Sequence, residues 1–231
     1  MTESEVRKTL EECGAIFNGH VVFTKKEIPP GSGNWFYFHG DSYVSKEMLY
    51  LRPAHMQMLA EEIARRLIGK KIDIIVGPAL GAIGLAPMVA NALTAIQHES
   101  LVPTFGVASC FAEKVGEEAM AIKRIFANYI KQVPGINIWI TEDIGNSGSS
   151  ARKTVRAARE LGANVVGVSF LATRHVLTPD DMDGVPVDWL AQFEVEMWPE
   201  DECPLCEKHG FRSVSRFFGK GENFLKRKGL L

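Results

Sequence analysis

The sequence is poor in cysteine, in net charge and in long apolar runs, and each shortage excludes a class of protein. Four cysteines in 231 residues are too few for a secreted disulfide framework. A formal net charge of -2 at pH 7 argues against a broad nucleic-acid-binding face, which needs a basic excess. No apolar run reaches the roughly 18 to 20 residues that cross a bilayer, and the charged start, MTESEVRKTLEECG, lacks the apolar centre of a secretory signal. We therefore expect a cytoplasmic protein with neither a nucleic-acid nor a membrane partner.

What is present is typical of a globular α/β protein. Apolar runs alternate with helical patterns along the middle of the chain, and the runs cover residues 72–76, 104–111, 136–140 and 165–171. Helices are expected at 53–67, through about residue 93, and at 151–161. Runs of this kind, joined by helices, predict a parallel, doubly wound sheet that is covered on both faces. Because ligands of such sheets bind at the carboxyl ends of the strands, we expect the site in the loops after Val76, Phe111, Ile140 and Leu171.

The strongest motif places two acids at the end of an apolar run. Glu142 and Asp143 follow Ile138-Trp139-Ile140-Thr141, and a loop of small and hydroxyl residues then leads into the expected helix. Small residues let backbone N–H groups converge, and the helix start adds a partial positive charge, so the loop is suited to an anion. The dipole contributes only about 0.3–1 kcal/mol, so several donors must share a phosphate. A helix-capping turn beside an incidental acidic pair is the alternative.

Residues 142–150 resemble the motif that binds 5-phosphoribosyl 1-diphosphate (PRPP) in type I phosphoribosyltransferases. The resemblance implies that Glu142 and Asp143 hold the ribose hydroxyls, with Asp143 also counted among the catalytic residues. It implies that the 5-phosphate is bound by Asn146, Ser147, Gly148, Ser149 and Ser150. Asn146 stands where the family more often has threonine. The resemblance further implies Mg²⁺ with PRPP, a small nitrogen base as second substrate, and a homodimer.

A second glycine-rich stretch lies about 70 residues upstream. Gly77, Gly81 and Gly84 have the spacing G-x-x-x-G-x-x-G, which is not the G-x-G-x-x-G fingerprint of dinucleotide-binding proteins. The stretch is similar to the pyrophosphate loop of orotate phosphoribosyltransferases, and the resemblance assigns the diphosphate to Gly77, Pro78, Ala79, Leu80 and Gly81. Taken alone, such glycines can equally serve close packing at a helix start.

Smaller segments also resemble orotate phosphoribosyltransferases. Residues 19–24 and 41–46 resemble the base-site region, and residues 111–114 resemble the start of the mobile catalytic loop. The resemblance makes Lys114 a mobile catalytic cation, although a solvated surface lysine is an equally simple interpretation, and it assigns the base to Arg174, Phe38 and Tyr43.

Two departures from the family pattern leave the function open. Residues 115–120 carry Glu117 and Glu118 and no histidine, and the lysine expected near the base is absent, with Phe38-His39 close to its position. Acids that face a diphosphate would repel it. The sequence therefore predicts a phosphoribosyltransferase acting on orotate or another base, with a non-catalytic PRPP-binding regulatory protein as the alternative.

The organisation predicted for the chain has three parts. Residues 1–52 form an N-terminal hood segment, residues 53–184 form the phosphoribosyltransferase core, and residues 185–231 form an appendage. In the appendage, Cys203 and Cys206 have the spacing of half a zinc site, with His209 three residues further on. A second C-x-x-C pair is absent, so two reduced thiols are preferred over zinc, and completion of a site by Cys13, Cys110 or a second subunit stays open.

Overall fold

The computed structural model describes residues 1–231 except 28–31, 33–34, 99–105 and 117–118. The described chain divides into two compact units. The core unit consists of residues 1–9 and 50–193, and the hairpin unit consists of residues 10–49 and 194–231. Most of the predicted N-terminal segment and most of the predicted appendage therefore fold together, although about 150 residues separate them in the sequence.

The core unit contains a six-stranded sheet in the order β5-β4-β3-β6-β7-β8. The strands are β3 (Ile74–Pro78), β4 (Ala108–Val115), β5 (Ala119–Ala121), β6 (Asn137–Gly145), β7 (Asn164–Thr173) and β8 (Val187–Gln192). Neighbours pair in parallel except for β5, which is antiparallel to β4. The predicted parallel sheet is confirmed. Several strands end later than their apolar runs, and β6 continues past Ile140 to Gly145.

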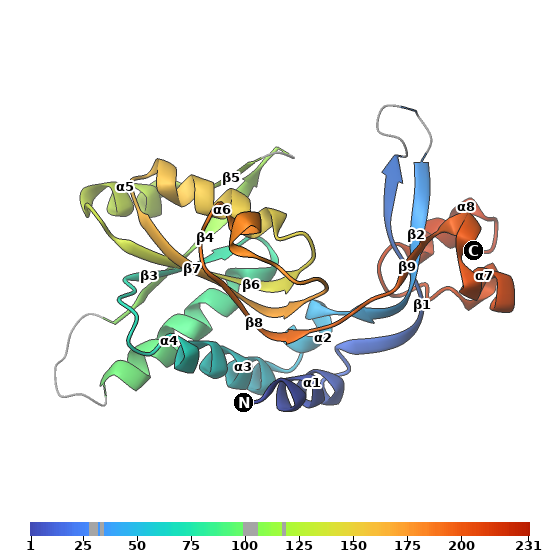
Figure 1. The fold of residues 1–231 in the computed structure, drawn as a ribbon, viewed down its shortest axis with the longest axis horizontal. Coiled ribbons are helices and arrows are strands. Elements are labelled where there is room, and N and C mark those ends of the chain that lie inside the picture. The colour runs from blue at the N-terminus through green and yellow to red at the C-terminus, as the bar shows by residue number, and fades with distance from the viewer. Residues whose placement is uncertain (28–31, 33–34, 99–105, 117–118) are drawn as a thin grey trace. The chain divides into compact units, whose positions relative to one another are not determined.

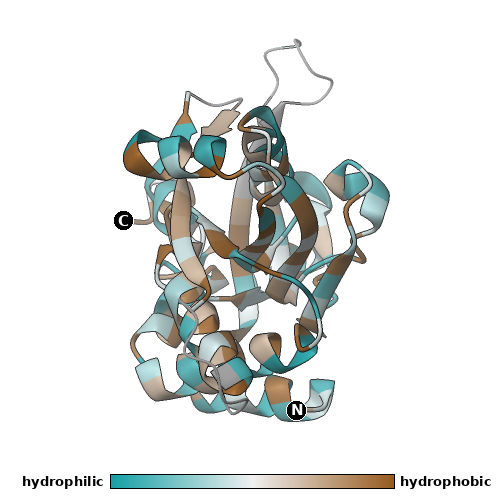
Figure 2. Ribbon diagram, turned by 90° about the vertical axis from the view of Figure 1, so that its left-hand side faces the viewer, coloured by the Kyte–Doolittle hydropathy of each residue, from teal (hydrophilic) through white to brown (hydrophobic). Residues whose placement is uncertain are grey.

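Helices cover both faces of this sheet (Figure 1). One face carries α3 (Pro53–Arg66) and α4 (Leu85–His98), and the other carries α5 (Arg124–Gln132) and α6 (Ser149–Glu160). Two 3₁₀ turns, η1 (Gly81–Ile83) and η2 (Pro179–Met182), follow β3 and β7. In α6, Ala151, Val155 and Ala158 recur at helical spacing and are fully buried in the core. Figure 2 shows the same pattern as hydrophobic colouring along the strands and alternating colouring on the helices.

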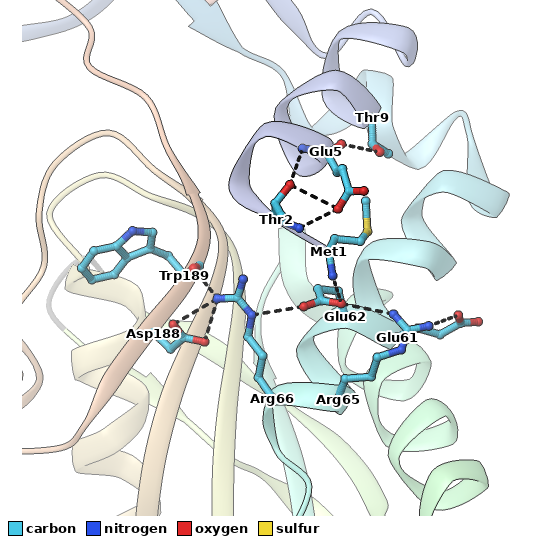
Figure 3. Close-up of polar contacts among 10 residues, drawn as sticks. All are labelled: Met1, Thr2, Glu5, Thr9, Glu61, Glu62, Arg65, Arg66, Asp188 and Trp189. Atoms are coloured by element: carbon cyan, nitrogen blue, oxygen red, sulfur yellow. Dashed lines mark hydrogen bonds and ion pairs between the residues drawn. The ribbon is translucent and has the colours of Figure 1, made fainter.

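An ion network joins α3 to an edge of the sheet and to the start of α1 (Glu3–Glu12), as Figure 3 shows. Glu62 is only 6% exposed and accepts from the Met1 amino group and from Arg65 and Arg66. Burial alone would raise the pKa of Glu62, but these hydrogen bonds lower it below its ordinary value. Arg66 also reaches β8, where its Nη1 lies 3.3 Å from both Asp188 carboxylate oxygens and 2.9 Å from the Trp189 carbonyl. The network therefore links elements that are distant in sequence.

The hairpin unit is built on a three-stranded antiparallel sheet in the order β1-β2-β9. Its strands are β1 (Ile16–Glu27), β2 (Trp35–Val44) and β9 (Met197–Pro199), and α2 (Lys46–Tyr50) follows β2. The tail adds η3 (Glu200–Glu202), α7 (Pro204–His209), η4 (Phe211–Ser213) and α8 (Gly221–Arg227). None of the helices in the described part of the chain is long and apolar enough to cross a membrane.

The tail lies along both sides of the β1–β2 hairpin. On one side β9 pairs with β2, and on the other the N–H groups of Ser215 and Lys220 donate to the His20 and Val22 carbonyls at 2.8 and 2.6 Å. The apolar cluster beneath is small and consists of Val22, Val214, Phe224 and Leu225, with Tyr37 and Leu230 packed against it. Backbone pairing and this apolar cluster thus hold the tail on the hairpin.

Candidate functional site

The topology of the core sheet identifies the edge at which a ligand would bind. β3 lies between β4 and β6, so the chain leaves β3 to one side and later returns on its other side. Such a switch point opens a crevice at the carboxyl ends of the strands. The two predicted phosphate loops lie at the carboxyl ends of these two strands. Residues 77–81 begin within the last two residues of β3, and residues 146–150 follow β6. The turn η1 packs against both β3 and β6. The structure therefore brings the two loops together.

The acidic pair lies within β6, close to its carboxyl end, rather than in the loop that follows. Glu142 and Asp143 are 7% and 3% exposed, and Asp143 Oδ1 accepts the Ile144 N–H at 2.6 Å. The backbone of β6 pairs with β7 at Glu142, opposite Phe170, and again at Ile144, opposite Ala172. Two adjacent carboxylates are thus held in surroundings of low dielectric, where their attraction to hydroxyl donors or to a cation is stronger than in water.

The loop after β6 is closed by two glycines. A Cβ at Gly145 would lie 2.9 Å from Phe170, and one at Gly148 would lie 2.1 Å from Met182. Gly148 also has φ +65°, which favours glycine, and it is the N-cap of α6. Asn146 and Ser147 are exposed, while Ser149 and Ser150 begin the helix. Exposed polar groups therefore stand beside the first-turn N–H groups of a helix, an arrangement that suits an anion.

The loop after β3 turns back sharply onto its own strand. A Cβ at Gly77 would lie 2.2 Å from the Ala82 carbonyl oxygen, so only glycine fits there. The Ala79 N–H donates to the Ala112 carbonyl at 2.7 Å, and the peptide bond between Ala79 and Leu80 is cis. Leu80 is 85% exposed at the tip. The loop thus presents its backbone at the same sheet edge as the acidic pair.

Tyr50 connects the glycine loop to the acids, and the sequence analysis missed it. Its hydroxyl donates to the Gly81 carbonyl, and its ring lies where a Cβ at Gly84 would approach to 2.9 Å. Burial raises the pKa of Tyr50, and the negative charges of Asp143 and Glu142 raise it further. Tyr50 therefore lies within electrostatic range of both carboxylates. A lone tyrosine just before a helix belongs to no recognisable motif, so the sequence offered no signal for it.

Two further predicted residues lie near the carboxyl ends of β7 and β4, the strands that flank β6 and β3. Arg174 follows β7, and its backbone N–H donates to the Gly145 carbonyl at 2.8 Å. This bond places the backbone of Arg174 beside the predicted phosphate loop. Lys114 is exposed in β4, where it pairs with Met120 of β5. The neighbouring Lys123, the next cation along the chain, forms an ion pair with Glu113 at 3.3 Å. Glu117 and Glu118, which set this stretch apart from the family pattern, lie outside the described residues.

The remaining predicted residues belong to the hairpin unit. Phe38 and Tyr43 are half-buried in β2, and the Tyr43 ring packs against Phe23 and Phe218, each with centroids 5.7 Å away. Cys203 is the N-cap of α7 and Cys206 lies within it.

Comparisons with known proteins agree with this geometry. Residues 47–197 match the model of the phosphoribosyl transferase domain. The orotate phosphoribosyltransferase of Caldanaerobacter subterraneus subsp. tengcongensis is 26% identical over 208 residues, covering 90% of this chain and 94% of that protein. The orotate phosphoribosyltransferase of Thermotoga maritima is 29% identical over 203 residues, covering 88% and 92%.

Solved structures support the fold. The orotate phosphoribosyltransferase of Aeropyrum pernix superimposes with a TM-score of 0.57 at 17% identity, covering 89% of this chain and 98% of that one. A phosphoribosyltransferase of Corynebacterium diphtheriae gives 0.56 at 19% identity, covering 82% and 95%.

The fold is that of a type I phosphoribosyltransferase, and the two predicted phosphate loops lie at the switch point of its parallel sheet. The family match covers 151 of the 231 residues, and the chain belongs to the phosphoribosyl transferase domain family. The prediction of a pentosyltransferase enzyme is confirmed, and a purely regulatory PRPP-binding role is not favoured.

Proposed function

We propose that this protein transfers the 5-phosphoribosyl group of PRPP to a small nitrogen base, and that the base is orotate or a close analogue. The observation that carries the proposal is the meeting of the acidic pair with two phosphate-type loops at one sheet edge. The choice of base is supported by the relatives, which are orotate phosphoribosyltransferases along about nine tenths of the chain.

Each element has a role that follows from its chemistry. Glu142 and Asp143 accept hydrogen bonds from the ribose hydroxyls, residues 146–150 bind the 5-phosphate, and residues 77–81 direct backbone groups to the diphosphate. The bond from the anomeric carbon to the diphosphate oxygen breaks, and a bond from that carbon to a nitrogen of the base forms. Catalysis in such a site consists mainly of positioning and stabilisation of the developing charges.

Mg²⁺ fits the donors that the site contains. Carboxylate oxygens are ligands that Mg²⁺ prefers, and Glu142 and Asp143 supply them beside the ribose position. The ion would neutralise part of the diphosphate charge. The ordinary pKa of tyrosine is already well above neutral pH and burial raises that of Tyr50 further, so Tyr50 keeps its proton and supports the glycine loop as a hydrogen-bond donor.

Arg174 is the first residue that we assign to the acceptor base. Arg174 is suited to a carboxylate or carbonyl of the base, and its N–H bond to Gly145 places it beside the phosphate loop. We include Phe38 and Tyr43 as base contacts, Lys114 as a cation for the diphosphate, and a homodimer, all on the strength of the family resemblance.

The proposal is tested by calorimetric titration of PRPP with Mg²⁺. The double variant Glu142→Gln, Asp143→Asn is expected to lose about 100-fold in PRPP affinity or more, since two hydrogen bonds to charged groups contribute about 1.5–3 kcal/mol each. Glu160→Gln, on the exposed end of α6, is the matched control and should bind as the parent does. Equal affinity in the double variant would contradict the assignment.

Turnover with a panel of bases then separates the functions. Consumption of orotate in the presence of PRPP is the expected result. Tight PRPP binding without turnover of any base would replace the enzyme by the regulatory alternative.

A further inference from the structure

The hairpin unit contains a cluster of four side chains that no part of the proposed reaction uses. His20 comes from β1, His39 from β2, and Cys203 and Cys206 from the start of α7. One ligand atom from each lies within 4.8 Å of all the others. His20, His39 and Cys203 are buried, and Cys206 is partly buried. The two histidines supply the second pair that a C-x-x-C motif lacks.

Three nitrogen–sulfur distances within the cluster are close to the edges of a tetrahedron around one metal ion. His39 Nδ1 lies 3.3 Å from Cys206 Sγ, and His20 Nε2 lies 3.5 Å from Cys203 Sγ and 3.7 Å from Cys206 Sγ. Zinc bonds of about 2.0–2.1 Å to nitrogen and 2.3 Å to sulfur place these atoms about 3.6 Å apart. The two imidazole nitrogens are 2.7 Å apart, against about 3.3 Å for a zinc tetrahedron, so metal binding would require the rings to separate by about 0.6 Å.

A hydrogen bond behind His20 sets the protonation that a ligand needs. The Ser213 hydroxyl has one proton, which it donates to the Gly210 carbonyl at 2.6 Å. The contact of 2.7 Å between Ser213 Oγ and His20 Nδ1 therefore has the imidazole as donor. With its proton on Nδ1, neutral His20 keeps a lone pair on Nε2, the atom that faces the cluster. Histidines that bind metals are oriented by outer partners of this kind.

We propose that His20, His39, Cys203 and Cys206 bind one zinc ion with a structural role. Four protein ligands complete a tetrahedron, and a closed set of this kind is typical of structural rather than catalytic zinc. Two sulfur and two nitrogen ligands favour zinc over the hard ions Mg²⁺ and Ca²⁺. His209, on the exposed end of α7, is not a member of the cluster. On this proposal the two cysteines are metal ligands, where the sequence alone favoured two reduced thiols.

The position of the cluster indicates a structural role for the ion. It would join β1 and β2 to a tail that is more than 160 residues further along the chain. The apolar cluster between the hairpin and the tail is small, and the free energy of binding a metal beside it would add to the stability of that contact. The ion would therefore fix the tail on the hairpin.

Metal analysis of untagged protein, expressed with added zinc and dialysed, tests the proposal directly. We expect about one zinc ion per chain in the parent and less than about a tenth of that in Cys203→Ser, Cys206→Ser. Two control variants, His209→Ala on the same helix and Cys110→Ala in the core unit, should retain the metal. Zinc far below one per chain in the parent, or unchanged content in the double variant, would overturn the proposal.

A second measurement avoids variants that could fail to fold. Zinc is removed from the intact parent chain by a chelator and replaced by Co²⁺, whose visible spectrum reports coordination. Intense bands of tetrahedral cobalt, with thiolate charge-transfer absorption, are the expected result. A six-coordinate cobalt spectrum, or a Cys203–Cys206 disulfide in freshly purified protein, would overturn the proposal. Neither result depends on PRPP binding, so this site and the proposed function can fail separately.

Discussion

The core unit and the hairpin unit are stabilised in different ways. The core unit packs helices on both faces of a six-stranded sheet, and its buried residues form an extended apolar cluster. The hairpin unit has three antiparallel strands, a small apolar cluster, and polar side chains at its centre. Burial lowers the pKa of both His20 and His39 to about 4, and burial together with Cys203 raises the pKa of Cys206 to about 12. The core unit thus has an extended apolar core, and on the zinc proposal the hairpin unit adds a metal to its smaller apolar cluster.

The largest effect is expected from metal removal, which should change amide hydrogen exchange in the hairpin unit and leave it unchanged in the core unit. On the zinc proposal, a chelator should raise amide hydrogen exchange in β1, β2 and α7 more than about 10-fold and leave β3, β6 and β7 protected, because local openings differ in free energy. Exchange measured by mass spectrometry with and without the chelator provides the test. A uniform rise across both units, or no rise in the hairpin unit, would contradict the contrast.

A smaller effect is expected from Gly77→Ala, which tests how strictly the edge of the core unit is shaped. The new Cβ would meet the Ala82 carbonyl at 2.2 Å, so the free energy of unfolding should fall by about 2–3 kcal/mol. On the proposed function, PRPP affinity should also fall. Urea unfolding and calorimetric titration measure the two effects.

Gly69→Ala is the matched control for that variant. Gly69 has φ +81° and open space around its Cβ position, so only backbone strain is introduced. A loss of about 1 kcal/mol with normal PRPP binding is expected. If both variants behaved alike, backbone fit at Gly77 would have no special importance.

The smallest effect is expected from Tyr50→Phe, which removes one hydrogen bond inside the core unit. Loss of the bond to the Gly81 carbonyl should cost about 1 kcal/mol in stability and a few-fold in PRPP affinity. Tyr129→Phe, at a side chain that is 52% exposed, serves as the control and should change neither quantity. Thermal unfolding and titration compare them. Equal behaviour of the two variants would exclude Tyr50 as a support of the glycine loop.

The sequence predicted the core unit better than the hairpin unit, for physical reasons. Long apolar runs joined by periodic helices specify a parallel sheet, and glycine loops between them mark its ligand edge. Strand ends were less predictable. Glu142 and Asp143 interrupt the apolar pattern, but backbone pairing with β7 carries β6 on to Gly145.

The hairpin unit could not be predicted from local patterns because its contacts join distant segments. His20 and His39 meet only through the register of β1 on β2, and the cysteines reach them from the tail. Likewise, Val187–Gln192 of the predicted appendage pairs with β7 in the core sheet. Nothing in the sequence near either segment specifies its partner.

The bond between the Arg174 N–H and the Gly145 carbonyl is made by the main chain alone. A substitution at position 174 therefore changes the side chain but keeps the backbone hydrogen bond to the loop that follows β6. On the proposed function, the specificity for the acceptor base can therefore change in evolution while binding of the sugar phosphate is conserved. On that proposal, the same scaffold could accept a different base after a change of the side chain at position 174.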